Sequence, residues 1–108
     1  MLYISDIYIK LHNKEKCRLE KNEKNILIQT IDEIYPEFKS SIYGLVPKLS
    51  TDELYMCYLI KTNLRPIDIA HQMCKERSSI SMKQTRLSKK MFGENGTIKM
   101  LNEFIHNI

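Results

Sequence analysis

The sequence contains no tryptophan and only three glycines, three prolines and three cysteines among its 108 residues. Because tight turns depend on glycine and proline, so few of them favour a small number of helices over many short strands. The cysteines are odd in number and lack a CxxC pair, and the histidines do not stand at zinc-finger spacing from them. We therefore expect reduced thiols in the cytoplasm, with neither a metal nor any other cofactor.

Long apolar runs and catalytic motifs are missing too. No stretch approaches the roughly 18 apolar residues of a membrane span, and the N-terminus lacks a signal-peptide pattern. We find no glycine-rich phosphate loop, no GxSxG elbow and no histidine–acid pair at metal or triad spacing. Ser78, Ser79 and Cys57 have no identifiable base to activate them. We expect a soluble binding protein with no membrane segment in this chain, and not an enzyme.

The charge of the chain is concentrated in one segment. The net charge is +4, but the residues from Lys75 to Lys90 carry six cations and one acid, so the remainder is close to neutral. Those cations are Lys75, Arg77, Lys83, Arg86, Lys89 and Lys90. A basic stripe on one element is typical of a protein that binds a polyanion, whereas a solvated helix face is the alternative.

Periodic apolar residues predict two or three helices in the first 48 residues, which we interpret as an N-terminal helical arm. The first helix runs from Ile4 to about Cys17, and the charged residues 18–25 form a loop or the start of the next helix. Residues 26–34 favour a helix, although their first three residues alone would suit a strand. Tyr35 ends this helix, because a residue before proline is pushed out of helical geometry. Pro36 then opens a third helix.

Residues 49–108 predict a second unit of four helices. Ser50 is the N-cap of the first, with Glu53 completing a capping box. This helix ends near Asn63, which tolerates the left-handed conformation that closes a helix. Thr97 caps the last helix.

The two middle helices of this unit form the most informative stretch of the sequence. A short helix from Pro66 to Met73 is followed by a turn over residues 74–77 and by a basic helix from Ser78 to Met91. Two helices joined in this way can place the second in a DNA major groove. The buried face of the second helix is predicted to be Ile80, Leu87 and Met91.

Residues 49–91 resemble the LuxR/GerE-type helix-turn-helix of bacterial transcription regulators, a winged-helix-like DNA-binding superfamily. The matching landmarks are Leu49-Ser50, Glu53, Leu59-Ile60, Asp68-Ile69-Ala70, Met73, Ser79-Ile80, Leu87 and Lys90-Met91. A subgroup that ends regulators with tetratricopeptide sensor regions is similar over more of the chain. Its matches are Ser5-Asp6-Ile7-Tyr8, Tyr35-Pro36-Glu37-Phe38, Leu59-Ile60-Lys61, Ile80-Ser81, Arg86-Leu87, Lys89-Lys90, Phe92-Gly93 and Asn102-Glu103-Phe104-Ile105. The chain departs from the broader family at Asn63 (usually glycine), Glu76 (usually serine or threonine) and Lys83 (usually histidine).

The resemblance implies an all-α fold, a helical bundle whose C-terminal four-helix domain is a LuxR-like helix-turn-helix, and binding to double-stranded DNA. It places base contacts at Ser81, Met82 and Thr85, and Arg86 on the same exposed face suits a guanine edge or a phosphate. The other five cations, Lys75, Arg77, Lys83, Lys89 and Lys90, then contact phosphates.

The family also dimerises through its last helix, which would suit paired half-sites in DNA. The corresponding dimer face here is Ile98, Leu101 and Ile105, and the alternative is that these residues pack on the core of their own domain. A different interpretation of the whole chain is a protein-interaction module with a helix-turn-helix-like fold. Its basic helix would bind an acidic protein partner, such as a subunit of RNA polymerase. A third interpretation is nucleic-acid binding that does not depend on sequence.

Overall fold

The computed structural model describes residues 4–12 and 18–108 of the chain, and these residues form helices without any strand. The all-α class predicted from the sequence is therefore confirmed. The helices are α1 (Ile4–Leu11), α2 (Lys21–Ile34), α3 (Phe38–Leu45), α4 (Thr51–Lys61), α5 (Pro66–Gln72), α6 (Arg77–Phe92) and α7 (Ile98–His106).

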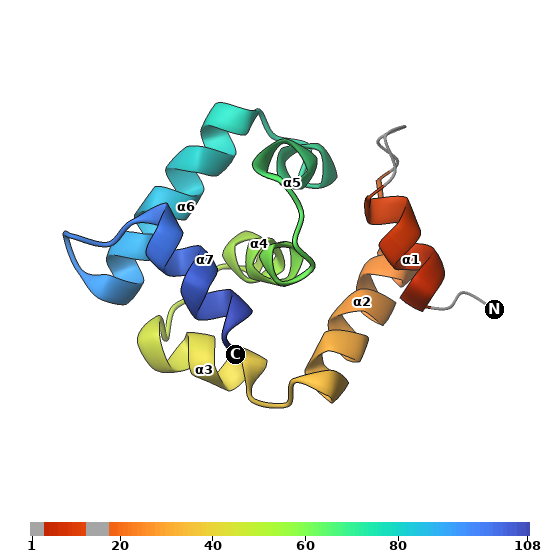
Figure 1. Ribbon diagram of the computed structural model, residues 1–108, viewed down its shortest axis with the longest axis horizontal. Helices are drawn as coiled ribbons and strands as arrows, with labels where there is room; N and C mark the ends of the chain where they lie inside the picture. Colours follow the sequence, from red (N-terminus) through yellow and green to blue (C-terminus); the bar gives the residue numbers. More distant parts are fainter. Residues whose placement is uncertain (1–3, 13–17) are drawn as a thin grey trace.

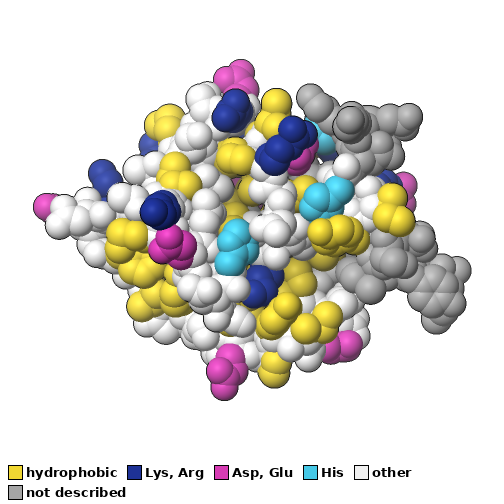
Figure 2. Space-filling model, in the orientation of Figure 1, with side chains coloured by type: hydrophobic (Ala, Val, Ile, Leu, Met, Phe, Trp, Pro, Cys, Tyr) yellow, Lys and Arg dark blue, Asp and Glu magenta, His cyan; other side chains and the backbone are white. Residues whose placement is uncertain are grey.

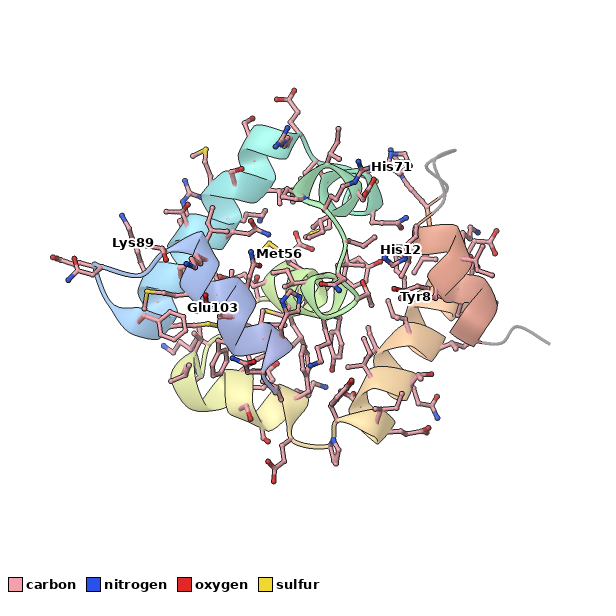
Figure 3. The ribbon with its side chains drawn as sticks, in the orientation of Figure 1. Tyr8, His12, Met56, His71, Lys89 and Glu103 are labelled. Atoms are coloured by element: carbon pink, nitrogen blue, oxygen red, sulfur yellow. The ribbon has the colours of Figure 1, made fainter. Side chains whose placement is uncertain are left out.

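Helix α4 lies at the centre of the molecule and is seen almost end-on in Figure 1. Helices α5, α6 and α7 surround it on one side, and the α1–α2 pair lies on the other. Five consecutive residues, Met56 to Ile60, are buried, so α4 buries its whole circumference and not one stripe. Figure 3 shows Met56 pointing into the interior between these helices.

The predicted N-terminal arm and the predicted C-terminal unit share one hydrophobic core. Its buried residues extend from Ile7 on α1 to Ile105 on α7. Tyr58 on α4 joins the two parts, because its hydroxyl donates to Asp32 Oδ1 at 2.6 Å and its ring lies 4.9 Å, between centroids, from that of Phe38. Helices α2 and α3 are thus packed onto α4, and α1 packs on α2.

Three N-terminal boundaries differ from the predicted ones. Helix α1 ends at Leu11, and the predicted end at Cys17 lies outside the described residues. Helix α2 begins at Lys21, inside the segment 18–25 that was predicted to be either a loop or a helix start. It begins there because the Glu23 carboxylate accepts the Glu20 N–H at 2.9 Å. Helix α3 begins at Phe38, two residues after Pro36, since its N–H bonds to the Tyr35 carbonyl and closes a turn.

The C-terminal boundaries follow their local signals closely. The Ser50 hydroxyl accepts the Glu53 N–H at 3.1 Å and the Glu53 carboxylate accepts the Ser50 N–H at 3.0 Å, which confirms the capping box. Asn63 has a φ of 67°, the left-handed conformation predicted for it. The Thr97 hydroxyl accepts the Met100 N–H and caps α7, again as predicted.

Candidate nucleic-acid interface

The turn between α5 and α6 fixes how α6 leaves α5. Cys74 has a φ of 56°, its N–H bonds to the His71 carbonyl, and the Lys75 N–H bonds to the Ala70 carbonyl at 2.9 Å. This pair of hydrogen bonds is the Schellman motif, which ends a helix and redirects the chain. Figure 1 shows α6 continuing at a steep angle to α5. The local geometry is that of two helices joined by a tight turn.

The N-terminal segment is tied to α5 just before this turn. The Leu19 N–H donates to the side-chain oxygen of Gln72 at 2.9 Å, and Gln72 is only 3% exposed. The Arg18 guanidinium donates to the His71 carbonyl at 3.2 Å. Sequence reasoning missed these contacts because a buried glutamine carries no periodic signal. They restrain the end of α5 against the residues that lead into α2.

Helix α6 has one buried face and one free face. It begins at Arg77 and ends at Phe92, one residue beyond each predicted end. The predicted buried residues Ile80, Leu87 and Met91 are all buried, which confirms the orientation of the helix. The same face also buries two polar side chains that the apolar pattern could not show, Gln84 and Ser88. Helix α6 packs against α5 and α7 through this face.

The free face brings together the four residues predicted to read bases. Ser81, Met82, Thr85 and Arg86 line one shallow, open depression of about 280 Å³. Met82 is 54% exposed and Arg86 is exposed, whereas Ser81 and Thr85 are half-buried. The Thr85 hydroxyl donates to the Ser81 carbonyl at 2.9 Å, so in the free protein its lone pairs are left to accept a further hydrogen bond. The contact of these residues with bases stays a prediction.

Two predicted phosphate ligands and Arg86 lie beside the first turn of α4. Lys83, Arg86 and Lys90 line a recess of about 220 Å³ together with Ser50 and Glu53. Arg86 borders both this recess and the depression described above, so it stands between the two predicted roles. Its position suits either a base edge or a phosphate.

Lys90 is already paired with an acid in this recess. Its ammonium lies 2.9 Å from Glu53 Oε2. Burial of Glu53 opposes its ionisation, but hydrogen bonds from Ser50 and Lys90 outweigh burial and hold the pKa of Glu53 below its ordinary value. Sequence reasoning missed the pairing because 37 positions separate the two residues. The pairing occupies one of the three donors of the Lys90 ammonium and leaves the other two for a further partner.

The remaining predicted phosphate ligands are exposed. Lys75 lies in the turn, Arg77 is the first residue of α6, and Lys89 stands on its outer side in Figure 3. Glu76 is the N-cap of α6, but its side chain makes no capping hydrogen bond. An exposed carboxylate therefore stands between two cations at the positive end of the helix.

The predicted dimer face on α7 requires a correction. Leu101 and Ile105 are both 0% exposed, so they pack in the core of their own chain, which was the alternative. Ile98 is half-buried. The face that α7 crosses in Figure 2 intersperses cations, acids and apolar side chains. Among its exposed residues are Met100 and the loosely paired Lys99 and Glu103, whose charged atoms are 4.0 Å apart.

Within residues 4–12 and 18–108, no three His, Cys, Asp or Glu side chains are grouped as metal ligands would be. None of the helices in these ranges has the length and apolar character to cross a membrane. Comparisons of the chain with family models, curated proteins and solved structures gave no match.

Proposed function

We propose that this chain is a sequence-specific double-stranded DNA-binding protein that regulates transcription, with α6 lying in the major groove. The observation that carries the proposal is the free face of α6. It presents Ser81, Met82, Thr85 and Arg86 as one continuous surface, while the opposite face is anchored in the core. An α-helix fits the major groove of B-DNA, where each base pair displays a distinct set of donors and acceptors.

The four side chains supply complementary kinds of base contact. Arg86 can donate two hydrogen bonds to the O6 and N7 atoms of guanine. The hydroxyls of Ser81 and Thr85 can bond to several base edges, and Met82 can pack on a thymine methyl group. Because Met82 and Arg86 are the more exposed pair, we assign them the larger share of discrimination.

The surrounding cations supply affinity that does not depend on sequence. Lys75, Arg77, Lys83 and Lys89 have no ion pair among the described residues, and Lys90 is held by Glu53. Each phosphate neutralised by such a cation releases counterions, so the affinity must fall steeply with salt. Regulation of transcription follows if the bound site lies in a promoter region.

Titration of labelled duplex DNA tests this function. A preferred site is first selected from a random duplex pool, and a scrambled duplex serves as the reference. Arg86→Ala should weaken binding to the preferred site by roughly 10- to 100-fold, since a bidentate base contact discriminates by about 1–3 kcal/mol. Binding to the scrambled duplex should fall much less. Lys99→Ala on α7 is the control and should change neither affinity.

Two results would contradict the proposal. An equal loss on both duplexes would mean that α6 binds DNA without reading it. No affinity for any duplex at low salt would leave the alternative, an interaction module for an acidic protein. Met82 favours that second candidate, because an apolar side chain exposed among cations suits a partner with both acidic and apolar groups. Met82→Ala should then abolish binding to that partner.

A further inference from the structure

A second group of cations lies on the other side of the first turn of α4. Lys21 and Lys24 on α2 and Lys39 on α3 line a recess of about 310 Å³, together with Thr51 and Asp52 of α4. These lysines belong to the N-terminal helices and lie outside the basic segment of the sequence. Their grouping is visible only in the folded chain.

The three ammonium groups are not neutralised by the described part of the protein. None of Lys21, Lys24 and Lys39 has an ion pair there, and Asp52 is the one carboxylate that lines their recess. The Lys24 ammonium lies 5.2 Å from the centre of the Tyr55 ring, a cation–π contact that leaves its charge in place. Lys90, on the opposite side of α4, is by contrast paired with Glu53.

The two basic recesses share the start of one helix. Ser50 and Glu53 line the recess that also contains Lys83 and Arg86, and Thr51 and Asp52 line the recess of the three lysines. An α-helix with its side chains is about 10–12 Å across. The two sets of cations therefore lie on either side of a helix of about this width.

The N-terminal lysines are also held at a fixed distance from α6. The hydrogen bond from Tyr58 to Asp32 joins α4 to α2, and the ring of Phe38, next to Lys39, packs on the ring of Tyr58. Figure 1 shows α4 between α6 and α2. A rigid partner that reaches across α4 could contact both recesses at once.

We propose that Lys21, Lys24 and Lys39 form a second phosphate-binding surface, which holds the backbone of the same duplex beside the segment that α6 reads. This inference rests on the function proposed above. A duplex is a rigid polyanion with one charge per about 1.7 Å of its axis, so it supplies phosphates on both sides of α4. The N-terminal helices are then part of the DNA-binding unit and not only an arm that supports it.

The test uses the full chain and two duplexes that contain the selected site. The short duplex covers the site alone, and the long one extends it by about one helical turn, about 10 base pairs, on each side. Binding of the wild type and of Lys21→Gln/Lys24→Gln/Lys39→Gln is measured between about 50 and about 200 mM salt. Lys99→Gln is the control, because this exposed lysine lies on α7.

We expect the triple variant to lose roughly 10-fold or more in affinity for the long duplex, and its log–log salt slope to shrink by about 0.9 for each phosphate contact removed. Its preference for the selected over the scrambled sequence should not change, since phosphate contacts carry no sequence information. Lys21→Gln/Lys39→Gln, which keeps the contact of Lys24 with Tyr55, should show a smaller change in the same direction. Circular dichroism shows that each variant is folded.

The outcomes separate this inference from the proposed function. If both lysine variants keep the wild-type affinity and salt slope on the long duplex while Arg86→Ala still loses its preferred site, the second surface is wrong and the function of α6 stands. If the loss in log affinity for each charge removed is the same in the lysine variants as in Lys99→Gln, the effect is one of net charge and the inference is again wrong. If the wild type binds no duplex at low salt, both proposals fail together.

Discussion

Tyr55 and Tyr58 show how differently two tyrosines on one helix can contribute to stability. The hydroxyl of Tyr55 is buried without a hydrogen-bond partner among the described residues, whereas that of Tyr58 donates to Asp32 at 2.6 Å. Burial raises the pKa of Tyr55 to about 12, so the hydroxyl is protonated at neutral pH. A buried polar group without a partner lowers the stability of the folded state, so removing the group should raise that stability.

Tyr55→Phe should therefore raise the free energy of unfolding by about 1 kcal/mol. The matched substitution Tyr58→Phe should lower it by roughly 1.5–3 kcal/mol, because it removes a hydrogen bond to a charged group. Urea unfolding of the two variants and the wild type measures both changes. A loss of stability in Tyr55→Phe would show that its hydroxyl has a partner, such as a bound water.

Gly96 and Gly44 form a second matched pair. A Cβ at Gly96 would overlap the backbone carbonyl of Ser88 on α6, whereas a Cβ at Gly44 would meet nothing within 4 Å. Gly96→Ala should cost about 1–3 kcal/mol by overpacking the loop against α6. Gly44→Ala, within α3, should gain about 0.5–1 kcal/mol. Thermal unfolding distinguishes the two, and equal effects would contradict the close approach at Gly96.

At the scale of elements, the ion pair between Glu53 and Lys90 joins α4 to α6. Because the folded state lowers the pKa of Glu53 below its ordinary value of 4.5, the unfolded state binds the proton more readily. The resulting stability is present above about pH 4.5 and is lost as the pH falls through the lower pKa of the folded state. Glu23 on α2 behaves in the same way. Burial opposes its ionisation, but its bonds to Glu20 and Lys10 hold its pKa below the ordinary value, so its contribution to stability is also lost in acid.

Glu53→Gln should accordingly be less stable than the wild type at neutral pH, and the difference should shrink between about pH 4.5 and more acidic values. The exposed Glu103→Gln serves as the control and should follow the wild-type curve. Urea unfolding at a series of pH values provides the measurement. A constant difference at every pH would show that the charge of Glu53 is not what joins α4 and α6.

The start of α6 can be improved by one substitution. Glu76 caps this helix without a side-chain hydrogen bond, and serine is a strongly preferred N-cap residue. Glu76→Ser should raise the free energy of unfolding by about 0.5–1 kcal/mol and should also tighten DNA binding, since it removes a carboxylate beside Lys75 and Arg77. Glu76→Gln separates the two effects, because it removes the charge alone. Unfolding experiments measure the change in stability, and duplex titration measures the change in DNA affinity. Weaker DNA binding in both variants would contradict the placement of the N-terminus of α6 near phosphates.

Local signals in the sequence predicted the elements well wherever neighbouring residues decide them. Ser50 and Thr97 cap their helices through residues three positions later, and Tyr35 before Pro36 ends α2. The ion pair of Glu23 could not be predicted in this way, because its partner, Lys10, lies on another helix. Long-range contacts of this kind carry no pattern in the chain.

The faces of the helices were predictable only where apolar residues mark them. Ile80 and Leu87 showed which side of α6 is buried, but the polar Gln84 and Ser88 share that side and looked like surface residues. An apolar stripe also does not reveal what covers it. Leu101 and Ile105 suited a dimer face as well as a core, and only the fold shows that α4 and α6 bury them.

At the scale of the whole molecule, the N-terminal helices α1–α3 and the C-terminal helices α4–α7 form one body. The radius of gyration is 13.5 Å, close to the value of about 13 Å expected for a compact domain of 100 residues. One hydrophobic cluster runs through both halves, and Leu19 is bonded to α5 beside the turn. The position of α6 therefore depends on packing that begins at α1.

The most direct test of the account is to map the protein surface that a duplex contacts, by following backbone amide chemical shifts during titration with the selected DNA site. We predict the largest changes along the free face of α6, at Ser81, Met82, Thr85 and Arg86, with smaller ones at the first turn of α4. Changes confined to α7, or spread over the surface without a maximum on α6, would contradict the claim that this helix reads DNA.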